Sequence, residues 1–223
     1  MKKFTLVISI FFLLLSSYGQ KYVGFMGGGN YSIMQSEVDF YTNDLNSRIS
    51  FGVGIFAKTN ITGSFNINVA TEYNNFATHV HSVGFSPSHS REYDYDLNLG
   101  YISANVLPEY SVGTKAQVFV QAGPYLAILI HSKMNGALEG YGPTADFTGE
   151  TLTGSANKYF DAFDAGFIFS TGLRFKLANA LFISPRIKYT LGLIDIGEDY
   201  FSTYDMSVRI RSIAFSVGIE SGL

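Results

Sequence analysis

The feature that most constrains this chain is the regular alternation of long and short connections between eight strand-like segments. The short connections cover residues 59–64, 113–115 and 178–180. The long connections cover residues 34–50, 78–97, 132–161 and 194–206. An antiparallel barrel that crosses a bilayer has short turns at one end and long loops at the other. The pattern therefore predicts an all-β, eight-stranded, antiparallel up-and-down transmembrane barrel, with both chain termini at the short-turn end.

The predicted strands alternate between apolar and polar side chains. In residues 163–176, Phe167 and Phe169 fall on one face, and Ser170 and Arg174 fall on the other. Several segments run for about 10 to 14 residues, longer than the ~5–6 of a typical soluble strand and enough for a tilted bilayer crossing. A membrane barrel turns its apolar face to lipid and its polar face to the lumen, so we expect the charged strand residues to be enclosed. The predicted strands are residues 22–33, 51–58, 65–73, 100–112, 116–131, 163–176, 181–193 and 208–220.

Residues 1–19 have the features of a secretory signal peptide. Lys2 and Lys3 supply the positive start, residues 4–15 form an apolar run, and Ser17 and Gly19 are the small residues before a cleavage site. The apolar run is shorter than the roughly 20 residues that a retained transmembrane helix needs. We therefore expect an exported chain whose residues 20–223 form one barrel domain.

Composition narrows the function classes. Without Lys2 and Lys3, the 15 basic residues fall to 13 against 18 acidic residues, a net charge of about −5. This balance argues against a nucleic-acid partner, which would need a basic surface. The chain has no cysteine, so no disulfide holds the fold.

Four charged residues on the polar strand faces are candidates for a network inside the barrel. The interior of an eight-stranded barrel is just wide enough for side chains to fill, and an unpaired buried charge costs several kcal/mol. We expect Glu72 and Glu109 to pair with Arg174 and Arg186 across the lumen and to close it. The alternative is that these residues lie near the rims, solvated and independent.

Three prolines fall inside predicted strands, at Pro108, Pro124 and Pro185. Proline lacks the N–H that a strand ladder requires and is normally found at strand starts, edges or bulges. We therefore expect a local bulge at each.

Short motifs spread over nearly all of residues 20–223 resemble the PorT-like family of outer-membrane barrels. The motifs are Val23-Gly24-Phe25 through Gly29-Asn30-Tyr31, Tyr101 through Leu107-Pro108-Glu109-Tyr110, Gly123-Pro124-Tyr125, Asp164-Ala165-Gly166, and Tyr189-Thr190-Leu191-Gly192-Leu193-Ile194-Asp195-Ile196. The resemblance implies a small eight-stranded barrel in the outer membrane and brings no catalytic residues. One member of that family assists a protein-secretion system, and extending that role to this chain would be analogy from fold.

The sequence offers few candidate metal-binding or catalytic residues. His79 and His81 would share one face if their segment is extended, and Glu92, Asp94 and Asp96 follow in the same long connection, so a divalent metal could be held there. Two close histidines in a polar segment are more often plain solvated side chains, and we treat them as weak candidates only. The chain has no nucleophile elbow and no arrangement that nominates a catalytic triad. The prediction is a protein without catalytic residues, cofactor or metal.

We expect a non-enzymatic outer-membrane protein with a structural or interaction role carried by its long surface loops, above all residues 132–161. Its partners would be outer-membrane lipid, envelope proteins and, during insertion, the barrel assembly machinery. The sequence ends at Leu223 and not at the aromatic residue that the assembly machinery usually recognises, so we expect either that Phe215 and Ile219 serve this recognition or that insertion is inefficient. The alternatives are a narrow channel for small solutes, an accessory factor of a secretion system, and a soluble exported binder with its apolar face inward.

Overall fold

The computed structural model describes residues 21–37, 42–86, 89–141, 147–155, 160–197 and 207–223. These residues form ten β-strands joined by turns and short irregular segments. Within these ranges no helix has the length and apolarity needed to span a bilayer. The expected signal peptide, residues 1–19, lies outside the described residues.

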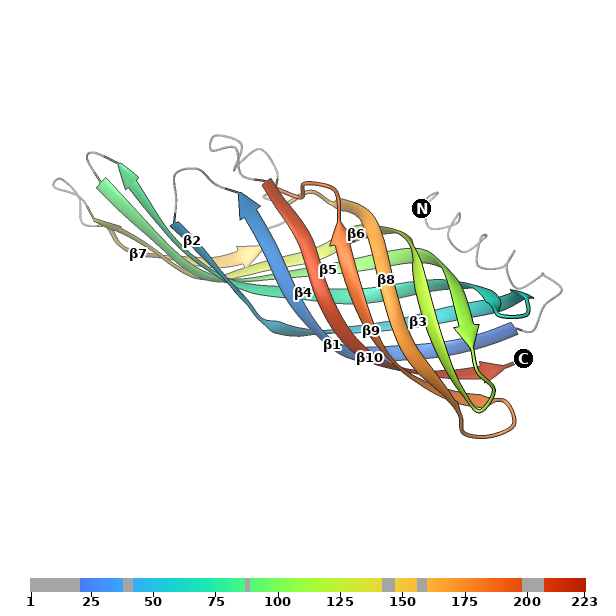
Figure 1. Cartoon of the computed structure of the whole chain (residues 1–223). Coiled ribbons are helices and arrows are strands. Elements are labelled where there is room, and N and C mark those ends of the chain that lie inside the picture. The colour runs from blue at the N-terminus through green and yellow to red at the C-terminus, as the bar shows by residue number, and fades with distance from the viewer. Residues whose placement is uncertain (1–20, 38–41, 87–88, 142–146, 156–159, 198–206) are drawn as a thin grey trace.

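Eight of the strands close into a ring (Figure 1). Each strand of the ring pairs with its two neighbours in antiparallel fashion, and the ring closes where β1 pairs with β10. In ring order the strands are β1 (Lys21–Glu37), β3 (Ile49–Thr62), β4 (Phe65–Ser86), β5 (His89–Val112), β6 (Ala116–Tyr141), β8 (Phe163–Lys176), β9 (Leu181–Gly192) and β10 (Ser207–Gly222). The chain therefore has the predicted fold, an antiparallel up-and-down barrel.

Short turns define one end of the barrel. Gly63 between β3 and β4 has φ 49°, and Gly113 between β5 and β6 has φ 115°. These left-handed conformations are strained for other residues, which explains glycine at both tight turns. The two described chain ends meet here, since the backbone N–H of Leu223 donates to the carbonyl of Lys21 at 2.9 Å.

At the other end, the hairpins continue as paired strands well beyond the expected boundaries. The β4–β5 ladder runs without a break to Ser86 and His89, and the β5–β6 ladder reaches Ser90 and Tyr141. Two further strands, β2 (Thr42–Ser47) and β7 (Phe147–Ser155), add to β4 and β6. We call this five-stranded sheet, β2-β4-β5-β6-β7, the extension (Figure 1).

The extension corrects the sequence prediction, which assigned these segments to loops. Residues 78–97 are almost entirely β-strand, and much of residues 34–50 and 132–161 is strand as well. Strands were predicted from an apolar outward face. Beyond the bilayer, the outward face can be polar while backbone pairing continues, so the strands of the extension lack the apolar outward face on which the prediction depends.

The two faces of β5 exchange character along its length. In the part nearer the short turns, outward Ile102 and Val106 are apolar, whereas inward Ser103 and Glu109 are polar. Beyond Gly100 the outward side chains are Asp94, Asp96 and Asn98, and those of Leu97 and Leu99 are buried inside. A strand surrounded by lipid needs apolar residues on its outward face, whereas a strand surrounded by water needs polar residues there. The level of Gly100 therefore marks the edge of the membrane on this strand.

The expectation of bulges at the prolines is wrong. Both ladders of β9 keep their register past Pro185, and β5 keeps its register with β4 through Pro108. The β5–β6 ladder has no paired residues between Asn105 and Glu109, yet its register is the same on both sides of this gap. The prolines therefore interrupt hydrogen bonding without inserting a residue. Register shifts fall elsewhere, between Asn60 and Thr62, Gly100 and Tyr101, and Leu138 and Gly140.

Candidate functional site: the barrel lumen

Charged side chains fill the lumen in the half nearer the short turns. They come from β3, β4, β5, β8, β9 and β10, and each is at most 8% exposed. The members are Lys58, Glu72, Glu109, Arg174, Arg186, Lys188 and Glu220, and we call them the lumen charge cluster. Period-two alternation places them inside because their neighbours in sequence face outward.

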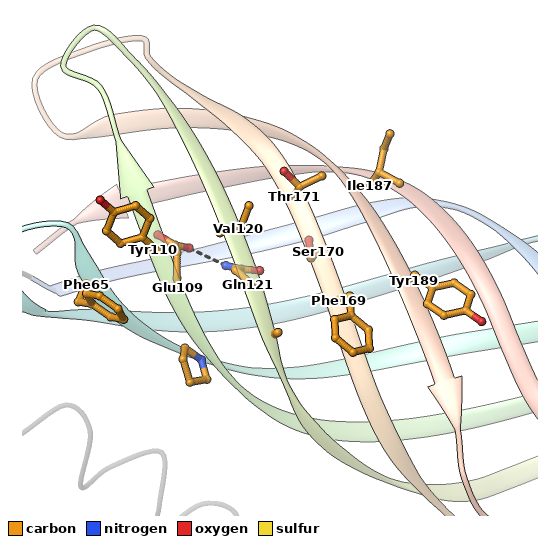
Figure 2. A pocket seen from close by; sticks show the side chains of 12 residues that line it. Phe65, Glu109, Tyr110, Val120, Gln121, Phe169, Ser170, Thr171, Ile187 and Tyr189 are labelled. Carbon is orange, nitrogen blue, oxygen red and sulfur yellow. Dashed lines mark hydrogen bonds between the residues drawn. The ribbon is translucent and has the colours of Figure 1, made fainter.

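One part of the cluster is a chain of alternating charges. Arg174 Nη2 donates to Glu109 Oε1 at 2.8 Å, and its Nε donates to Glu220. Lys58 Nζ lies 2.6 Å from Glu220 Oε2 and 3.9 Å from Glu109 Oε1. Neutral donors complete the shell of Glu109, since Gln121 Nε2 donates to it at 2.5 Å (Figure 2) and Asn66 Nδ2 at 3.1 Å. Full engagement of the carboxylates offsets the cost of burying them.

Glu72 forms a second pair, with Lys188 rather than with an arginine. Lys188 Nζ donates to Glu72, and Asn105 Nδ2 donates to Glu72 Oε1 at 2.9 Å. Lys188 Nζ also lies 3.5 Å from Asn74 Oδ1. The expected arginine partner of Glu72 is therefore replaced by the lysine two residues after Arg186 on the same inward face.

Arg186 lies between aromatic rings. Its guanidinium carbon is 5.1 Å from the ring centre of Phe56 and 5.4 Å from that of Phe119, within the range of cation–π attraction. Arg186 Nη2 donates to Ser184 Oγ at 3.0 Å, and within the described residues no carboxylate oxygen lies within 4.0 Å of its guanidinium. A Cβ at Gly218 would lie 2.8 Å from Arg186 Nη2, so that glycine makes room for the guanidinium.

The cluster carries four cations and three carboxylates, a net charge of about +1 with all groups ionised. Arg186 is the cation without a close carboxylate. Cation–π contacts and the longer-range field of the glutamates are what stabilise it in this site.

An apolar layer closes the lumen beyond the charges, toward the extension. Its buried side chains come from inward positions of β4, β5, β6, β8 and β10 and from the segments that flank β8 and β9. The members are Phe76, Leu97, Leu99, Tyr101, Leu107, Tyr125, Ala127, Phe160, Ile168, Ile196, Val208 and Ile210, and we call them the apolar plug. Of the two tyrosines in the plug, Tyr125 donates its hydroxyl to the buried carboxylate of Asp164 at 2.7 Å, whereas the buried hydroxyl of Tyr101 has no hydrogen-bond partner among the described residues.

The segments that precede β8 and follow β9 are hydrogen-bonded to each other and contribute two residues to the apolar plug. Phe160 forms a bridge with Gly197, and the N–H of Asp161 donates to the carbonyl of Ile196 at 2.9 Å. The N–H of Ile196 in turn donates to Val208 at 2.9 Å. These bonds place Phe160 and Ile196 among the inward side chains of the barrel.

The weak metal candidates lie elsewhere, on the outward face of the extension. His79 Nδ1 is 2.8 Å from Asp96 Oδ1, and His81 Nδ1 is 3.8 Å from Asp94 Oδ2. Arg48 Nη1 also contacts Asp96, at 2.6 Å. Across the described residues, no three histidine, aspartate or glutamate side chains are grouped in a way that could hold a metal ion.

The sequence predicted four members of the cluster but did not predict Lys58, Lys188 and Glu220 as partners. The sequence does place these three residues on the polar, inward face, because each alternates with outward residues of its own strand. The structure brings Glu109 and Arg174 into contact, but Glu72 contacts neither arginine within 4.0 Å. The choice of partner depends on register around the ring, which the pattern within one strand does not contain.

Comparisons with known proteins agree with this architecture. A family model described as "Outer membrane protein beta-barrel domain" matches residues 19–198. No curated protein matches the chain.

Among solved structures, the chain is similar to the outer membrane protein OprG from Pseudomonas aeruginosa, with 10% identity, 91% of this chain and 96% of that chain covered, and a TM-score of 0.51. It is also similar to Neisserial surface protein A, with 13% identity, 91% and 97% coverage and a TM-score of 0.48. The attachment invasion locus protein Ail of Yersinia pestis matches at 13% identity, with 90% and 99% coverage and a TM-score of 0.41. At these identities the OprG match supports the fold alone.

Proposed function

Because the chain belongs to the outer membrane protein beta-barrel domain family, we propose that it is a non-enzymatic envelope protein in which a closed barrel anchors a contact surface outside the membrane. The chain lies in the outer membrane, as that family does. The observation that carries the proposal is the extension, a sheet that continues the barrel wall beyond the level at which β5 loses its lipid-facing side chains.

The filled lumen supports an anchor better than a channel. A solute would have to displace the lumen charge cluster, whose carboxylates are each held by two or more donors, and then the apolar plug. Breaking one buried ion pair costs about 3–5 kcal/mol. Passage through both layers would therefore require a large rearrangement of the barrel interior.

The extension has the chemistry of a contact surface. Among its described residues, the outward side chains include the polar and charged groups of His79, Asp96 and Lys133. In the described part of the chain, β2 pairs with β4 alone and β7 with β6 alone, so the extension has a strand at each edge. Edge strands can add a strand from another chain, which is a common mode of protein recognition. We infer that other envelope proteins are the partners.

Shortening the extension tests this proposal. In the test variant, an Asn-Gly turn replaces residues 80–95 and joins the paired positions His79 and Asp96. Proteins that are crosslinked to the wild-type chain in intact cells should not be crosslinked to this variant. As a control for folding, the wild-type chain and the variant should each migrate differently on a gel before and after boiling, as a folded barrel does. Equal crosslinking of the two chains would overturn the assignment of the contact surface.

Conductance separates the anchor from the channel alternative. Wild-type protein in a planar bilayer should show no large steady conductance, because both layers fill the lumen. A stable open level in every insertion would contradict a closed anchor. An accessory role in secretion is supported only by the PorT-like motif order, and loss of secreted proteins on deletion of the gene would test it.

A further inference from the structure

A groove of about 580 Å³ runs over the outer wall of the barrel, across β4, β5, β6, β8 and β9 (Figure 2). This volume is within the range of ~300–1,000 Å³ that small-molecule sites occupy. The groove lies in the half of the wall nearer the short turns. Phe65 begins β4, and Tyr110 is two residues from the end of β5.

The groove exists because small side chains lie between large ones. Pro108 and Ala122 form its floor, at the gap in the β5–β6 ladder. The aromatic side chains of Phe65, Tyr110 and Phe169 stand around this floor. Each of the three is about half exposed, and Phe65 and Tyr110 are in ring contact with centroids 5.4 Å apart.

The groove does not lead into the lumen. Glu109 and Gln121, the strand neighbours of Pro108 and Ala122, are part of its lining, but their side chains are 0% and 4% exposed and are hydrogen-bonded to each other on the inward face of the wall. The exposed surface of the groove is almost entirely apolar. It is therefore a blind apolar site that opens to the outside.

What lies outside at this level is lipid. The chain is an outer-membrane barrel, and the groove is continuous with the exposed apolar residues Val120 and Ile187 of the same wall. Short turns of such barrels face the periplasm, so this half of the wall meets the inner leaflet. A tyrosine at this end, Tyr110, stands at the level where interfacial aromatic residues meet lipid headgroups.

We propose that this groove is a binding site for one phospholipid of the inner leaflet, with an acyl chain lying over Pro108 and Ala122 between the aromatic side chains. The lipid is held there more tightly than the general lipid coat, because a chain in the groove contacts a floor and two walls instead of one surface. The site lies within the membrane, so it does not depend on what the extension binds.

Fluorescence quenching can test the site without background, since the chain has no tryptophan. Phe169→Trp places a reporter on the groove rim, and Phe25→Trp places a matched reporter on β1, outside the groove and 72% exposed before substitution. Each protein, folded in detergent micelles, is titrated with a phospholipid whose acyl chains carry bromine. Ala122→Leu fills the groove floor, and Ala104→Leu is the matched control on the outward face of β5.

The Phe169→Trp signal should be quenched saturably at about one lipid per protein, at a lipid concentration about tenfold below that which quenches Phe25→Trp. Ala122→Leu should remove this difference and Ala104→Leu should keep it. The comparison of the two reporters in otherwise wild-type protein tests the site even if Ala122→Leu fails to fold. Parallel quenching of the two reporters, or saturable quenching that Ala122→Leu leaves unchanged, would overturn the proposal.

Discussion

Replacing Glu109 by glutamine tests how strongly the lumen charge cluster stabilises the barrel. The Glu109 side chain is fully buried, and its carboxylate accepts from Arg174 at 2.8 Å, Gln121 at 2.5 Å and Asn66 at 3.1 Å. Glutamine keeps the size of the side chain but removes its charge, so the net charge of the cluster rises from about +1 to about +2. Breaking a buried pair in this way costs about 3–5 kcal/mol, because the buried cations Arg174 and Lys58 are then left with Glu220 as their one carboxylate partner among the described residues.

An exposed pair in the same chain provides the control. Arg48 Nη1 lies 2.6 Å from Asp96 Oδ2, the same separation as between Lys58 Nζ and Glu220 Oε2 in the lumen, but the Arg48 and Asp96 side chains are 50% and 30% exposed. Surface pairs contribute about 0–1 kcal/mol, so Arg48→Gln should lower the free energy of unfolding by no more than that. The difference between the two substitutions therefore measures the effect of burial.

The free energy of unfolding is obtained from denaturant titrations of protein inserted in lipid vesicles. The folded fraction is followed by the gel mobility of unboiled samples. The expected midpoint falls well below wild type for Glu109→Gln and close to wild type for Arg48→Gln. Equal, small losses would show that water or mobile ions reach Glu109, and would refute the closed lumen.

Two further substitutions test the inside of the barrel by the same titration. Arg174→Met should lower the free energy of unfolding by about 3–5 kcal/mol, because Glu109 and Glu220 each lose a buried cationic partner and keep only Lys58. Arg186→Met should cost at most ~2 kcal/mol, since it breaks cation–π contacts but no close ion pair among the described residues. Equal losses for the two substitutions would contradict this difference. Gly218→Ala should cost about 1–3 kcal/mol, because its Cβ would lie 2.7 Å from Ser184 Oγ and 2.8 Å from Arg186 Nη2, and a neutral result would show that the guanidinium can move aside.

The alternation within each strand was enough to predict the barrel and the side on which its charges lie. Glu72, Glu109, Arg174 and Arg186 are all buried inside, as their positions among outward apolar residues implied. The partners were less predictable. Glu72 contacts Lys188 because register and tilt around the ring bring β4 and β9 together across the lumen, and neither quantity can be read from a single strand.

The extension was missed for a different reason. Its strands keep apolar residues such as Val80 and Leu97 at inward positions, but their outward residues, such as His79 and Asp96, are polar. This is the pattern of a soluble sheet, opposite in sense to the membrane-spanning part. A single alternation pattern, with apolar residues outward, therefore predicts strands that end near the membrane edge, and this is why the predicted ends of β4 and β5 fall short of the observed ones.

Spin labels at two neighbouring residues test the central claim most directly. Phe215 is 58% exposed on the outward face of β10, and Ser216 is 9% exposed on its inward face. In lipid vesicles, oxygen dissolved in the membrane should relax a label at position 215 strongly and one at position 216 weakly. The reverse order of oxygen accessibility would contradict a barrel whose apolar residues face lipid and whose charges are enclosed.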